Sequence, residues 1–156
     1  MLHPAPTTKL DPVLTRATLL RVTEPTETKP AWAVLGFPNT NYEVYLEVGD
    51  ELETFRPHTG AMILCTVHIT ARRVDVTSAG GRCVDPCYGT PRRIQGIVGA
   101  LDPRANTLVV NVGPGFNVWL TLGAPGQRAE GFTDADFITC DVMPGASVRF
   151  RERYSV

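Results

Sequence analysis

The chain has 156 residues, a formal net charge of −1 and an apolar fraction of 43%. The near-neutral charge excludes a general electrostatic attraction to nucleic acid or anionic lipid, although a local basic patch remains compatible with it. No apolar run approaches the roughly 20 residues of a membrane-spanning helix, so we expect no membrane partner.

The first twelve residues, MLHPAPTTKLDP, lack the basic start and apolar middle of a signal peptide. We therefore expect a cytoplasmic protein, and the four cysteines then indicate reduced thiols rather than a disulfide framework. No motif in the sequence calls for a cofactor. Residues 1–14 contain three of the prolines without apolar periodicity and indicate an N-terminal arm.

Beyond the arm, glycine- and proline-containing turns separate short apolar runs, a pattern typical of an all-β protein. In the third run, Tyr42, Val44, Leu46 and Val48 alternate with Asn41, Glu43, Tyr45 and Glu47, which predicts a strand with Tyr45 and the two glutamates turned outward. Strands are predicted in chain order at 17–22, 32–37, 42–48, 61–76, 94–100, 107–112, 118–122, 137–143 and 146–150, with helical turns at 50–57.

The chain also contains an internal repeat. A shift of 76 positions, the difference between Asn117 and Asn41, also sets Pro38 on Pro114. The repeat predicts a first β module at 15–76, a turn-rich connector at 77–91 and a second β module at 92–156. A module of about 60 residues buries little surface alone, so we expect the two to pack together or to share a sheet through the long strand at 61–76.

Three strands, a short helical bridge and two further strands form the order of an oligonucleotide/oligosaccharide-binding (OB) barrel. The sequence at 106–150 resembles this fold, and the sequence at 15–74 resembles it more weakly. The resemblance implies two tandem OB-like barrels. It raises single-stranded nucleic-acid binding as one function, through arginines and base-stacking aromatic residues.

Two groups of side chains are candidates for binding. The aromatic candidates for a protein interface or a stacking surface are Trp32, Tyr45, Tyr88, Phe116 and Trp119. The arginine candidates for nucleic acid are Arg72, Arg73, Arg82, Arg92 and Arg93. Glu43 and Glu47 flank Tyr45 and would repel a phosphate backbone there.

A metal site is a further hypothesis, because Cys65, His68, Cys83 and Cys87 are ligand types that zinc accepts. Residues three apart on a strand point to opposite faces, so Cys65 and His68 converge only across a bulge. Nucleophilic catalysis has no recognisable motif here, and no catalytic residue is predicted.

The leading hypothesis is therefore a non-catalytic β-barrel interaction module that acts through protein contacts or homo-oligomerisation. Single-stranded nucleic-acid binding and metal binding are its alternatives. A surface on which arginines and aromatic residues coincide would favour nucleic acid, whereas aromatic residues alone would favour a protein interface.

Overall fold

The computed structural model describes residues 13–155, and the chain is all-β as predicted, with one short α-helix and three short 3-10 turns in that range. The N-terminal arm expected at 1–14 lies almost wholly outside the described residues. The strands are β1 (Thr15–Thr23), β2 (Trp32–Gly36), β3 (Glu43–Glu47), β4 (Met62–Val76), β5 (Cys83–Asp85), β6 (Tyr88–Gly89), β7 (Arg93–Asp102), β8 (Thr107–Gly113), β9 (Phe116–Leu122), β10 (Phe137–Val142) and β11 (Ser147–Arg153). The helical pieces are η1 (Gly49–Glu51), α2 (Leu52–Phe55), η2 (Arg56–His58) and η3 (Ala129–Gly131).

Five strands form a closed circuit that we call the first ring, in the order β1, β2, β3, β11 and β4. β1 to β3 form an antiparallel meander. β3 then meets β11 in a parallel pairing at Glu47 and Ser147, and β11 runs antiparallel to the first part of β4. β4 pairs with β1 and closes the ring.

Five strands likewise form the second ring, in the order β7, β8, β9, β4 and β10. β7 to β9 form its meander. β9 pairs in parallel with the later part of β4, which runs antiparallel to β10. β10 pairs with β7 and closes this ring.

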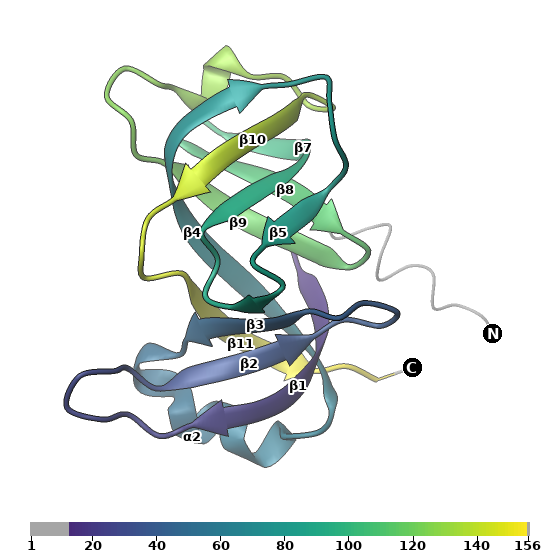
Figure 1. The fold of residues 1–156 in the computed structure, drawn as a ribbon, viewed down its shortest axis with the longest axis vertical. Helices are drawn as coiled ribbons and strands as arrows, with labels where there is room; N and C mark the ends of the chain where they lie inside the picture. Colours follow the sequence, from purple (N-terminus) through teal and green to yellow (C-terminus); the bar gives the residue numbers. More distant parts are fainter. Residues whose placement is uncertain (1–12, 156) are drawn as a thin grey trace.

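β4 is therefore common to both rings and runs through the length of the molecule in Figure 1. One edge of β4 carries β1 and then β9, and the other carries β11 and then β10. The first ring takes its last strand, β11, from the end of the chain, while the later part of β4 completes the second ring. The last strand of the chain thus completes the first ring and the end of β4 completes the second, an arrangement that we call the strand exchange.

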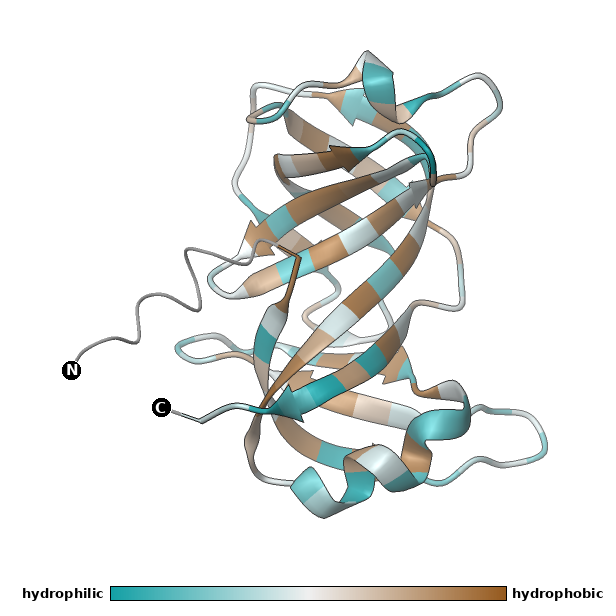
Figure 2. Cartoon of the chain, turned by 180° about the vertical axis from the view of Figure 1, so that it is seen from behind, coloured by the Kyte–Doolittle hydropathy of each residue, from teal (hydrophilic) through white to brown (hydrophobic). Residues whose placement is uncertain are grey.

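The interiors of the rings are filled by alternating apolar side chains, and this alternation along the strands is visible in Figure 2. Fully buried members include Leu35, Leu46 and Ile63 in the first ring and Leu108 and Leu120 in the second. All of them belong to one continuous cluster. The two rings share one core, so neither is expected to be stable alone.

Polar contacts also join the rings where β1 and β9 meet end to end. The buried Thr15 hydroxyl donates to the Asn117 carbonyl and accepts the Asn117 N–H at 3.0 Å. The Asn117 side chain donates to the Leu14 carbonyl at 2.7 Å. The bonds with Thr15 satisfy the backbone N–H and carbonyl of Asn117 directly before the pairing of β9 with β4 begins at Val118.

Candidate functional site

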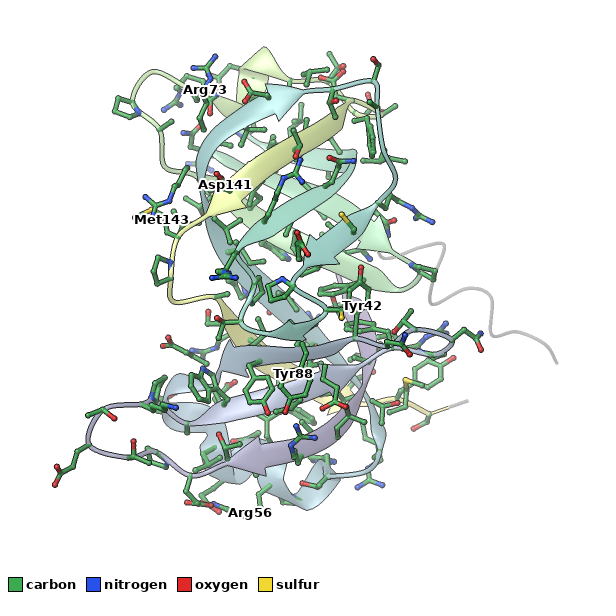
Figure 3. The ribbon with its side chains drawn as sticks, in the orientation of Figure 1. Tyr42, Arg56, Arg73, Tyr88, Asp141 and Met143 are labelled. Carbon is green, nitrogen blue, oxygen red and sulfur yellow. The ribbon has the colours of Figure 1, made fainter. Side chains whose placement is uncertain are left out.

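Three aromatic side chains gather on the outside of the first ring, which we call the aromatic face: Trp32, Tyr45 and Tyr88, with Arg21, Glu43 and Glu47 beside them. Tyr45 points outward because the buried residues of β3 are Val44 and Leu46. β6 pairs with β3 so that Tyr88 is the register partner of Glu43. Figure 3 labels Tyr88, which lies over the first ring.

The three aromatic side chains contact one another in sequence. Trp32 and Tyr45 meet edge to face with centroids 5.5 Å apart, and Tyr45 and Tyr88 are 5.7 Å apart. The two tyrosine hydroxyls are 3.2 Å apart and share a hydrogen bond. Tyr88 is 59% exposed, so the cluster is held together while its outer member stays in solvent.

Arg21 fixes this cluster from β1. Its guanidinium donates to the Tyr45 hydroxyl at 2.9 Å and to Glu43 at 3.0 Å, and it lies 5.7 Å from the centroid of the Tyr45 ring. The hydrogen bonds with Tyr88 and Arg21 lower the pKa of Tyr45, whereas the bond to Tyr45 raises the pKa of Tyr88. Tyr45 is therefore the phenol of the pair that ionises first.

A bulge explains why Arg21 reaches this face. Leu19 pairs with Leu35, but the next pair is Arg21 with Val34, so Leu20 is an extra residue. In a regular strand Arg21 would follow Leu19 to the interior; the bulge turns it outward. Leu20 also turns outward and covers Gly36, where an added Cβ would lie 3.0 Å from the leucine side chain.

An open hollow of about 500 Å³ adjoins the aromatic face at Glu43. Leu20 and Gly36 form part of its wall, and Phe37, Asn41 and Tyr42 form another part. Its lining is mixed, and it offers both apolar surface and amide hydrogen-bonding groups. The face and the hollow together form a continuous surface with groups suited to binding.

The other two aromatic candidates do not lie on this face. Phe116 is 1% exposed and stacks on Phe37 with centroids 4.1 Å apart, so it belongs to the core between the rings. The prediction that Phe116 is a surface residue is wrong, because this side chain follows the β8–β9 turn and packs inward against Phe37 and Tyr42. Trp119 is half-buried on β9 beside His68, and its indole N–H donates to the Val13 carbonyl at 3.2 Å.

The arginine candidates lie mainly on the second ring. Arg72, Arg73, Arg92 and Arg93 line adjoining hollows next to β10. Arg82 is separate from them and bonds to the Asn111 side chain. None of the five lines the hollow beside the aromatic face. The arginine on that face is Arg21, whose charge is paired with Glu43.

The four metal-ligand candidates do not assemble. Cys65 points into the first ring, and burial raises its pKa to about 12; His68 lies on the outside and contacts the Thr66 hydroxyl at 2.9 Å. Cys83 pairs within the β5–β7 ladder, and Cys87 is exposed. Among residues 13–155, no three His, Cys, Asp or Glu side chains form a group able to hold a metal ion.

Comparison with known protein families, characterised proteins and solved structures finds no match to this chain. No helix in the described part of the chain is long and apolar enough to span a bilayer. Sequence reasoning missed Arg21, because the bulge at Leu20 has no signature in an apolar strand.

Proposed function

We propose that this chain is a non-catalytic interaction module that binds protein through the aromatic face, and that its partner is a second copy of the same chain. The observation that carries this proposal is the Trp32–Tyr45–Tyr88 cluster held by Arg21. Tryptophan, tyrosine and arginine dominate the binding energy of protein interfaces. Because hydrogen bonds already restrict Arg21, Tyr45 and Tyr88, less rotamer entropy is lost when a partner binds.

We further propose that both rings are OB-like barrels. In each ring the first three strands form a meander. The last strand runs parallel to the third, and the fourth strand pairs with the first and closes the ring. OB-like barrels bind ligands on the outside of their second and third strands and on the loops around them. The aromatic face lies on β2 and β3, and Tyr88 comes from the segment that follows β4. Its position supports a binding role for this face.

The charges on the aromatic face favour protein over nucleic acid. Glu43 and Glu47 outnumber Arg21, which is already paired with Glu43. Glu47 makes no ion pair with any described residue. A face that carries both positive and negative charges can be complementary to itself across a two-fold axis. Arg21 of one copy can then meet Glu47 of the other.

The test is sedimentation equilibrium over a range of concentrations. We expect a reversible dimer that Tyr88→Ala weakens by about thirtyfold, which corresponds to the roughly 2 kcal/mol lost at an interface hot spot. Leu101→Ala is the matched control, because Leu101 is an exposed apolar side chain on the second ring. A monomer at all concentrations, or equal weakening by both variants, would overturn the proposal.

Single-stranded nucleic acid is the second candidate, and one observation favours it: aromatic residues able to stack on bases lie on the ligand-binding side of an OB-like strand order. Fluorescence anisotropy with a mixed-sequence oligonucleotide at low salt tests it. Saturable binding that Tyr88→Ala abolishes would replace the protein interface with this function. No binding at tens of micromolar oligonucleotide would remove the candidate.

A further inference from the structure

A second surface, unrelated to the aromatic face, lies on the second ring. It consists of three adjoining hollows that we call the arginine groove, with volumes of about 280, 430 and 300 Å³. Arg72 lines all three hollows, and Arg73 and Arg93 line the first of them. Figure 3 labels Arg73 and Asp141, which line the same hollow.

A bulge in β4 creates this concentration of guanidinium groups. Cys140 pairs with Val74 and Val142 with Ala71, so β4 has one residue more than β10 between these pairs. Ala71 and Val74 are both buried, and the two residues between them, Arg72 and Arg73, are both exposed. In a regular strand one of them would point into the second ring; the bulge turns both outward.

The positive charges in the groove are only partly neutralised. Arg73 pairs with Asp75 at 3.1 Å, but 74% of the Arg73 side chain is exposed, so this ion pair is weak. Arg93 bonds to the neutral Thr139 hydroxyl at 3.0 Å. Arg72 and Arg92 make no ion pair with a described residue.

Carboxylates do not cancel this charge. The groove contains four arginines, Arg72, Arg73, Arg92 and Arg93, against the two carboxylates Asp75 and Asp141. The local excess is two positive charges, on a chain whose net charge is −1. The excess is confined to a small concave area, which suits a compact dianion better than an extended polyanion.

The lining also discriminates between kinds of anion. The third hollow is mainly apolar, lined by Ala71, Gly123, Ala124, Pro125 and Met143 beside the two arginines of β4. No aromatic side chain is among the described residues that line the three hollows. Bases of a single strand would find nothing to stack on here, whereas a small organic group attached to the anion would find apolar surface.

We propose that the arginine groove binds a phosphate monoester, with Arg72 and Arg93 as the principal ligands and the organic group of the ester against Met143. A phosphate monoester carries close to two negative charges at neutral pH and offers three acceptor oxygens. Guanidinium groups bind such oxygens in pairs of parallel hydrogen bonds. This inference is independent of the aromatic face and of the proposed dimer.

The probe for the test is phenyl phosphate, titrated into the labelled full chain and followed by NMR. We expect saturable shifts of the Arg72 and Arg93 side-chain signals and of the Met143 methyl signal. Arg72→Gln should weaken binding about tenfold or more, because it removes charge-assisted hydrogen bonds. Asp141→Asn should tighten binding, because it removes an opposing charge that two hollows share.

Controls separate this site from general attraction to positive charge. Arg151→Gln removes an exposed arginine on β11 of the first ring and should leave binding unchanged. Inorganic phosphate should shift the arginine signals and leave the Met143 methyl signal unchanged. Three results would overturn the proposal: no saturable shift, equal responses to Arg72→Gln and Arg151→Gln, or binding of a mixed-sequence oligonucleotide that phenyl phosphate does not displace. If Arg72→Gln alters the amide spectrum broadly, Arg93→Gln takes its place.

Discussion

Val148→Ala is expected to destabilise the first ring, although Val148 lies in the last strand of the chain. Val148 is 0% exposed and pairs with Val67 of β4. The substitution removes two methyl groups at about 0.8 kcal/mol each. The cavity that remains adds to this loss. Together they lower the free energy of unfolding by about 2–3 kcal/mol.

The two tryptophans report on the rings separately, because Trp32 is in β2 and Trp119 is in β9. Urea unfolding of the Trp119→Phe and Trp32→Phe proteins, followed by fluorescence, reports the unfolding midpoint at β2 and at β9 respectively. With a urea m-value of about 2 kcal/mol/M, Val148→Ala should lower the midpoint reported by Trp32 by about 1–1.5 M. Because β4 and the core are common to both rings, the Trp119 transition should move with it.

The alternative arrangement makes the opposite prediction. If β11 completed the second ring and β4 belonged to the first ring alone, the rings would have no strand in common. Val148→Ala would then lower the Trp119 midpoint and leave the Trp32 midpoint unchanged. That result would refute the strand exchange. Val118→Ala is the matched control, since Val118 is equally buried in β9 and also pairs with Val67.

Three further predictions concern single residues. Gly96→Ala should lower the free energy of unfolding by about 1–3 kcal/mol in urea, because the new Cβ would overlap the backbone carbonyl of Asn111; Gly131→Ala, with open space around it, should change little. His68 should titrate below its usual pKa of 6.5 in NMR, since burial and Arg149 disfavour its charged form. The unfolded chain then binds the proton more readily, so stability should fall as the pH drops below 6.5; a His68 pKa at or above that value would contradict this. Cys87 should react with a thiol reagent in the folded protein, and Cys65 only after unfolding; equal rates would count against the burial of Cys65.

The all-β class and the strand positions follow from local patterns. The alternation of residues 41–48 predicts the outward direction of Tyr45, and β3 has that burial pattern. The exchange of last strands could not be predicted, because an apolar strand has the same sequence whichever ring it completes. The boundaries at 15–76, 77–91 and 92–156 remain predictions, since the exchange places strands of both sequence modules in each ring.

The aromatic face was only partly predictable for a related reason. Tyr45 and Tyr88 are 43 residues apart, and their contact depends on the parallel pairing of β6 with β3. The outward direction of Arg21 depends on a bulge in β1, and the common outward direction of Arg72 and Arg73 depends on a bulge in β4. Phe116 was misplaced because a turn sequence shows where the chain reverses but not which ring surface the next side chain faces.

Strand exchange across β4 is the central claim, and NMR contacts at Val67 test it most directly. Val67 pairs with Val148 on one edge of β4 and with Val118 on the other. We therefore predict backbone NOEs from Val67 to both residues in the same protein. NOEs from Val67 to Val118 alone, with those of Val148 leading to another strand, would contradict the exchange.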